Sequence, residues 1–85
     1  MSYSVEWSRT ALRQLAATWL AAPDRGAVTS ASHRLERALA SGPYAVGLPR
    51  GSSVNRTAID LPLGIEYEII EDNKKVRVIG AWSLL

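Results

Sequence analysis

Residues 57–79 read TAIDLPLGIEYEIIEDNKKVRVI and alternate apolar with polar side chains over most of their length. A period of two is typical of strands that bury one face. Two breaks divide the segment. Pro62-Leu63-Gly64 suits a three-residue hairpin loop with the glycine in a left-handed conformation, and Asp72-Asn73 suits a second turn. We therefore predict a three-stranded antiparallel meander.

The lengths of these two turns predict which residues face each other across the meander, because loop length sets the register of a hairpin. The residues that pair would also form, together with Thr57, the apolar face that covers the helices. The predicted pairs are Ile59 with Tyr67, Leu61 with Ile65, Tyr67 with Val78, and Ile69 with Val76.

The opposite face of the predicted sheet would be mixed in character. Glu68 would lie across from Arg77 as an ordinary ion pair between strands. Ile70 and Ile79 would add apolar area among the charges, and we expect a partner segment to bind there. The full set of residues on this face would be Arg56, Ala58, Asp60, Glu66, Glu68, Ile70, Lys75, Arg77, Ile79 and Ala81.

The chain upstream of the meander predicts one strand and two helices. Residues 3–7 alternate as a short strand, and Ser8 can cap a helix that begins at Arg9 and ends at Pro23. Asp24 can cap a second helix, which Gly42 would end in a left-handed turn. The predicted buried stripes are Leu12, Leu15, Ala16, Trp19 and Leu20, then Val28, Ala31, Leu35, Ala38 and Leu39.

The predicted fold class is therefore α+β, in the order strand, two helices and three strands, within one domain of residues 1–85. The helices should form an antiparallel hairpin, because only about three residues join them. Residues 43–53 are rich in glycine, proline and serine and predict a loop. The place of the first strand in the sheet is left open.

Composition excludes several kinds of site. The chain has no cysteine, which rules out disulfides and thiolate ligands, and its one histidine, His33, is expected on the exposed side of the second helix. We therefore expect neither a metal nor a cofactor. No segment approaches the ~20 apolar residues of a membrane span, and the N-terminus lacks a basic lead and an apolar signal core. We expect a cytoplasmic protein that does not contact a membrane.

Positive charge is concentrated in the first two-thirds of the chain. Residues 1–57 have a balance of +4 and residues 58–85 a balance of −2, which together give the net charge of +2. Four arginines fall on the solvent side of the predicted helices. They form either an ordinary solvated surface or a docking surface for an acidic partner segment, and both readings stay open. These four are Arg9, Arg13, Arg34 and Arg37.

The order and spacing of these elements resemble the RelE/ParE superfamily, the toxins of bacterial toxin–antitoxin pairs. The resemblance runs along nearly the whole chain. The matching segments are residues 3–15 for the opening strand and first helix, 41–43 for the end of the second helix, LPRG at 48–51, IEYEI at 65–69 and VRVIG at 76–80. WLAAPDR at 19–25 and PLG at 62–64 are similar to one subgroup of the superfamily.

The chain departs from the pattern of the RNA-cleaving branch. That branch opens its central strand with a tyrosine–arginine pair, where this sequence has Leu63 and Gly64. It places a basic residue after the glycine of its last strand, where this sequence has Ala81 and Trp82. It also has a C-terminal tyrosine, which has no counterpart before Leu85.

The resemblance implies a cognate antitoxin as partner and leaves two classes of activity open. One is a ParE-like inhibitor that binds a target such as DNA gyrase. The other is a RelE-like endoribonuclease that cleaves mRNA at the ribosome. An inactive homologue kept as a partner-binding module is a third alternative. The catalytic residues are unassigned, and the candidates for contacting or cleaving RNA are Arg56, Arg77 and Arg50.

Overall fold

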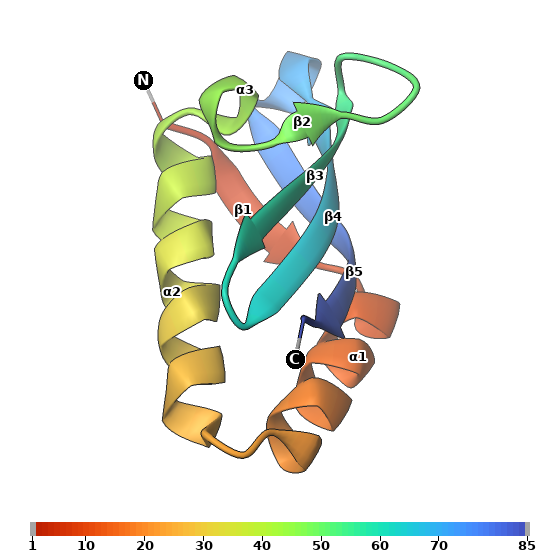
Figure 1. Ribbon diagram of the computed structural model, residues 1–85. Coiled ribbons are helices and arrows are strands. Elements are labelled where there is room, and N and C mark those ends of the chain that lie inside the picture. The colour runs from red at the N-terminus through yellow and green to blue at the C-terminus, as the bar shows by residue number, and fades with distance from the viewer. Residues whose placement is uncertain (1, 85) are drawn as a thin grey trace.

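The computed structural model describes residues 2–84 and contains four helices and five strands. Figure 1 shows two long helices beside a twisted sheet, so the α+β prediction is confirmed. The helices are α1 (Arg9–Ala21), α2 (Arg25–Ser41), α3 (Pro43–Val46) and the 3₁₀ turn η1 (Glu71–Asn73). The strands are β1 (Ser4–Trp7), β2 (Leu48–Pro49), β3 (Asn55–Asp60), β4 (Leu63–Ile70) and β5 (Lys75–Ser83).

The strands form one sheet in the order β1-β5-β4-β3-β2. β1 pairs in parallel with β5, which settles the position that the sequence left open. The prediction of a loop at residues 43–53 is wrong in part. Pro43 begins α3, and Leu48 and Pro49 pair with Thr57 and Arg56 as a short edge strand.

Both long helices begin at the predicted caps. The amide of Ala11 donates to Ser8 Oγ at 3.0 Å, and that of Ala27 donates to Asp24 Oδ1 at 3.1 Å. The prediction of a left-handed Gly42 is wrong, because its φ of −170° is extended backbone. The chain leaves α2 through this extended residue and turns at once into α3. No helix among the described residues is long and apolar enough to cross a membrane.

The turn of the first hairpin begins one residue earlier than predicted and is one residue shorter. It consists of Leu61-Pro62, and β4 already begins at Leu63. Ile59 lies opposite Gly64 and not Tyr67, so the register differs from the prediction by three residues. A shift by an odd number of residues exchanges the two faces of β3. Ala58 therefore lies opposite Ile65 and is buried, whereas Ile59 is 59% exposed.

This shift makes several predictions about β3 and the first turn wrong. Thr57, Ile59 and Leu61 do not face the helices. Arg56, Ala58 and Asp60 lie on that side instead. Gly64 is not a left-handed turn residue but part of β4, and the indole of Trp82 lies directly over it.

The second hairpin has the predicted register over most of its length. Tyr67 lies opposite Val78, Ile69 opposite Val76 and Glu68 opposite Arg77. A β-bulge then shifts β5 by one residue beside Glu66. The extra residue in β5 returns Ala81 to the core side, so its predicted place on the open face is wrong.

The core lies between α2 and the sheet, and its largest fully buried side chains come from α2, β4 and β5, with Pro43 of α3. α1 contributes much less than its apolar stripe predicts. In Figure 1 the two helices diverge from the loop that joins them, and α1 lies near the end of β5. Gln14 Oε1 there accepts a hydrogen bond from the Ala81 amide at 2.9 Å. Of the described α1 residues only Ala11 is fully buried, and Leu12, Trp19 and Leu20 are exposed.

Candidate functional site

Arg56 lies inside the protein, against the segment that joins α2 to β3. Its guanidinium donates to the carbonyl oxygens of Ser53 at 2.9 Å, Tyr44 at 2.9 Å and Gly47 at 2.8 Å. The side chain is 8% exposed. Beside it, burial raises the pKa of Tyr67, while the charge of Arg56 opposes that shift. Arg56 thus holds the 44–53 segment to the sheet and is not presented to a ligand.

Arg77 lies on the sheet surface that faces away from the helices. We call this surface the outer sheet face and define it by Glu6, Thr57, Glu68, Lys75 and Arg77. Glu6 lies 3.0 Å from Lys75 Nζ and 3.6 Å from Arg77 Nε, and Glu68 lies 3.5 Å from Arg77 Nη1. The hydrogen bond from Lys75, aided by the charge of Arg77, lowers the pKa of Glu6. Each of these cations is therefore already beside a carboxylate.

Arg50 follows the edge strand β2, and its guanidinium reaches Thr57 Oγ1 at 3.4 Å. Its backbone amide bonds to the Asn55 carbonyl, which puts it in the same row as Glu68 and Arg77. Three strand spacings separate Arg50 from Arg77, or roughly 14 Å between backbones. The structure therefore does not bring Arg50, Arg56 and Arg77 together.

The two isoleucines proposed for partner binding both lie on β4 or β5 and are partly exposed. Ile70 ends β4 opposite Lys75, and Ile79 is the residue that the bulge inserts into β5. Ile79 lies four residues along β5 from Lys75, or roughly 13 Å, so the two isoleucines do not form one patch. Elsewhere, His33 is exposed as predicted, and no cluster of three metal-ligating side chains occurs within residues 2–84.

The four helix arginines fall into two groups. Arg34 Nε and Nη2 each lie 2.8 Å from an oxygen of Asp60, in a bidentate pair that joins α2 to β3. The hydrogen bond from Arg34 lowers the pKa of Asp60. Arg9, Arg13 and Arg37 are exposed and form no salt bridge with any described residue. Only these three are available to an acidic partner without breaking an internal pair.

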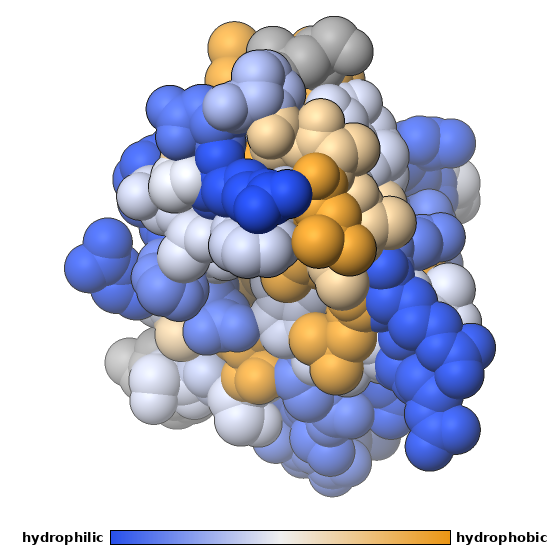
Figure 2. Space-filling view, turned by 90° about the horizontal axis from the view of Figure 1, so that it is seen from below, coloured by the Kyte–Doolittle hydropathy of each residue, from blue (hydrophilic) through white to orange (hydrophobic). Residues whose placement is uncertain are grey.

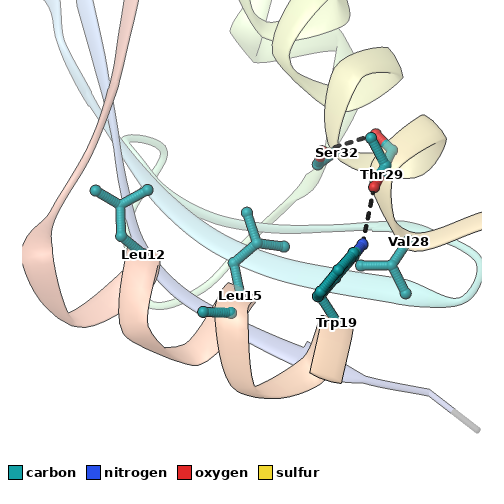
Figure 3. Close-up of a pocket in the computed structure, with 7 residues that line it drawn as sticks. Leu12, Leu15, Trp19, Val28, Thr29 and Ser32 are labelled. Carbon is teal, nitrogen blue, oxygen red and sulfur yellow. Dashed lines mark hydrogen bonds between the residues drawn. The ribbon is translucent and has the colours of Figure 1, made fainter. Parts of the chain in front are cut away.

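An apolar groove of about 380 Å³ lies between the two long helices. Figure 3 shows Leu12, Leu15 and Trp19 of α1 facing Val28, Thr29 and Ser32 of α2 across it. We call this the α1–α2 groove; its lining residues are Leu12, Leu15, Ala16, Trp19, Val28, Thr29 and Ser32.

One end of the α1–α2 groove is closed by a polar bridge. Trp19 Nε1 donates to Thr29 Oγ1 at 3.2 Å, and the Arg25 guanidinium lies 4.7 Å from the Trp19 ring. Leu12, near the other end, is 52% exposed. Figure 2 views this side of the molecule and shows apolar residues running through its middle, with hydrophilic residues on both flanks. The sequence predicted this stripe as buried and so missed the groove.

No family model and no curated protein matches this chain. Solved structures do. The RelBE2 toxin–antitoxin complex of Mycobacterium tuberculosis matches with a TM-score of 0.77 at 21% identity, covering 98% of this chain and 92% of that one. The chromosomal ParDE system of P. aeruginosa gives 0.65 at 14% identity, covering 99% and 98%.

A third structure is the free E. coli toxin RelE with two arginines replaced. It gives a TM-score of 0.70 at 16% identity and covers 98% of this chain and 84% of that chain. All three likenesses extend over nearly all of the present chain, and their low identities make them evidence of fold. The chain has the fold of the RelE and ParE toxins.

Proposed function

We propose that this protein is the toxin of a type II toxin–antitoxin pair, acting in the cytoplasm as a ParE-like inhibitor that binds its target, with DNA gyrase as the model target. The fold that it shares with RelE and ParE toxins supports the general class. The positions and partners of its arginines support inhibition by binding rather than RNA cleavage.

RNA cleavage by such a fold needs several groups around one phosphate. A base must deprotonate the 2′-hydroxyl, cations must stabilise the charged transition state, and an acid must protonate the leaving oxygen. Here Arg56 is enclosed by backbone carbonyls, and Arg77 is paired with Glu6 and Glu68. A phosphate beside Arg77 would meet these two carboxylates. The observation that carries the proposal is that Arg50, Arg56 and Arg77 lie apart, with Arg56 enclosed and Arg77 paired with carboxylates.

Induced expression tests the proposal. Growth should stop on induction and recover when the product of the adjacent reading frame is expressed with it. The 5′ ends of cellular transcripts should be unchanged, while purified protein should inhibit supercoiling by gyrase. Ribosome-dependent cuts that disappear in Arg77→Ala would instead assign the RelE-like activity. Absence of any growth effect would contradict the toxin proposal.

The antitoxin should use the exposed arginines Arg9, Arg13 and Arg37, with contacts to Ile70 or Ile79 where it reaches the sheet. Arg34 was predicted to bind the partner together with these three, but its pairing with Asp60 should make its contribution to binding the smallest. Rim charges chiefly affect association rate and salt dependence. Replacing Arg9 and Arg13 by glutamate should therefore slow association with the adjacent gene product and reduce its sensitivity to salt.

A further inference from the structure

Four apolar side chains gather beside Thr57, at one end of the outer sheet face. We call them the apolar corner and define it by Leu48, Ile59, Leu61 and Trp82. Leu48 is 76% exposed, Ile59 59% and Leu61 67%. A contiguous exposed apolar patch on a small protein commonly marks a contact surface. The apolar corner is therefore a candidate for binding another molecule.

Strand pairing makes the apolar corner continuous. Ile59 lies opposite Gly64, and Gly64 lies opposite Trp82, so the three form one row across β3, β4 and β5. Gly64 has no side chain, and the indole of Trp82 covers its place in the row. Leu48 lies opposite Thr57, two residues before Ile59 and on the same face of the sheet. The apolar side chains thus adjoin one another across four strands.

A depression of about 390 Å³ opens beside the apolar corner, and we call it the β2–β3 pocket. Its lining residues come from positions 46–50 and 57–59, and both Leu48 and Ile59 are among them. It lies where β2, which pairs only with Arg56 and Thr57, runs beside the longer β3 (Figure 1). Protein interfaces concentrate their binding energy in anchor side chains that fill pockets of this kind.

The charges near the β2–β3 pocket restrict what can bind there. Arg50 lines the pocket, is exposed and forms no salt bridge with any described residue. Glu66 lies opposite Thr57 on β4 and likewise has no salt bridge within residues 2–84. Arg50 would attract a carboxylate of the bound molecule, and Glu66 would repel it. That carboxylate must therefore lie on the β2 side of the apolar corner.

This combination suits a protein surface better than a nucleic acid. Nucleic acids are bound by several cations that neutralise their phosphates. Among the described residues of the apolar corner and the β2–β3 pocket, only Arg50 is basic. In the proposed function the antitoxin uses arginines of the helices, and the apolar corner shares none of those residues. An inhibitor must also bind its target, and the apolar corner is available for that second contact.

We propose that the apolar corner and the β2–β3 pocket are the surface by which this protein binds its target. The occupant is a folded protein that places a bulky apolar side chain in the pocket and a carboxylate beside Arg50. This inference rests on the proposed function, because it assigns the contact surface of the inhibited target. It also assigns the target and the antitoxin to different parts of the molecule.

Ile59 and Leu20 make a matched test, because they are 59% and 61% exposed and only Ile59 lines the β2–β3 pocket. Ile59→Asp places a carboxylate on the apolar surface. It should raise the concentration of protein that half-inhibits supercoiling by purified gyrase at least about tenfold, and it should relieve growth arrest. Leu20→Asp adds the same charge to α1 and should change that concentration less than about threefold.

Binding of the adjacent gene product serves as the control for folding. Both variants should bind this product within about threefold of wild type and keep the wild-type circular dichroism spectrum. If Ile59→Asp keeps the spectrum and loses this binding, the apolar corner belongs to the antitoxin surface and the inference is wrong. A wild-type dimer in solution that Ile59→Asp dissociates would assign the apolar corner to a second copy of the chain.

A series at Arg50 tests the charge requirement without changing the apolar surface. Arg50→Lys should keep gyrase inhibition within about twofold, whereas Arg50→Glu should weaken it about tenfold, and by more at low salt. Equal inhibition by these two variants would show that no carboxylate of the target meets Arg50. Ribosome-dependent cuts in transcripts that Arg50→Glu abolishes would assign this surface to RNA and overturn the inference.

Failure of this inference differs from failure of the proposed function. If wild type and Ile59→Asp arrest growth equally, the toxin proposal stands and the apolar corner is not the target surface. If wild type does not arrest growth, the toxin proposal fails and this inference fails with it. If wild type arrests growth without inhibiting gyrase and Ile59→Asp relieves the arrest, the surface assignment stands and only the choice of gyrase is wrong.

Discussion

The outer sheet face and the helical side of this protein differ in whether their charged side chains form salt bridges. On the outer sheet face, Lys75 and Arg77 lie beside the carboxylates of Glu6 and Glu68. On the helical side, Arg9 and Arg13 are exposed, form no salt bridge with any described residue and lie on the helix that lines the α1–α2 groove. The outer sheet face thus pairs its own charges, whereas Arg9 and Arg13 of α1 remain without a salt bridge.

Arg56 should give the largest effect on stability. Arg56→Ala leaves the carbonyls of Tyr44, Gly47 and Ser53 without their donor inside the protein. Losing these charge-assisted bonds should reduce the free energy of unfolding by about 3 kcal/mol. Urea denaturation measures the change, with Arg50→Ala as an exposed control expected within about 0.5 kcal/mol. Equal effects of the two variants would show that Arg56 does not hold the 44–53 segment.

Gly47 should give the next effect, because it lies in the same segment. A Cβ at this position would come 2.5 Å from the Thr57 carbonyl oxygen and 2.8 Å from the Tyr67 hydroxyl. Gly47→Ala should therefore cost about 2 kcal/mol in thermal or urea unfolding. Gly42→Ala is the control, since nothing lies within 4 Å of its added Cβ. A neutral Gly47→Ala would mean that the segment shifts freely.

Replacing the paired Arg34 and replacing the unpaired Arg37 should have different effects on stability at low pH. Arg34 lowers the pKa of Asp60, so the folded state holds its proton less tightly than the unfolded chain. The resulting stability is present above the ordinary aspartate pKa of about 3.9 and is lost as pH falls through the lower folded value. Wild type should therefore lose more stability than Arg34→Ala below about pH 4. Arg37→Ala, which removes no salt bridge, should follow the wild-type curve; identical curves for all three would contradict the pairing.

Leu12 should give the smallest effect on the isolated protein. Leu12→Ser removes an exposed side chain and should change the free energy of unfolding by less than about 0.5 kcal/mol. Leu39→Ala, on α2 and 0% exposed, should cost roughly 2–5 kcal/mol. A large loss of unfolding free energy in Leu12→Ser would mean that the groove residues stabilise the fold and are not simply an exposed surface.

The sequence predicted best those features that depend on neighbouring residues. The caps at Ser8 and Asp24 and the register of the second hairpin are confirmed. The predicted turn of the first hairpin was wrong because Pro62-Leu63-Gly64 has the composition of a turn. Gly64 instead lies in β4, where the absence of a side chain makes room for the Trp82 indole. Alternation alone cannot place a turn to the residue.

The helical groove was missed for a different reason. The stripe of Leu12 and Trp19 is the same in sequence whether or not another element covers it. Its exposure depends on the angle at which α1 leaves α2, which is set by contacts of α1 with β5 such as Gln14 to Ala81. Arg56 was likewise placed on the open face, because its burial follows from the register shift of β3. The only hint of the groove in the sequence is the length of the apolar stripe on α1, which includes more residues than the structure buries.

Amide hydrogen exchange of the protein alone and with the adjacent gene product tests the division between the two sides most directly. α1 and the first half of α2, residues 9–32, should gain protection in the complex, while the centres of β4 and β5 should change little. Protection that appears instead along β4 and β5, with α1 unchanged, would place the partner on the outer sheet face and contradict the account.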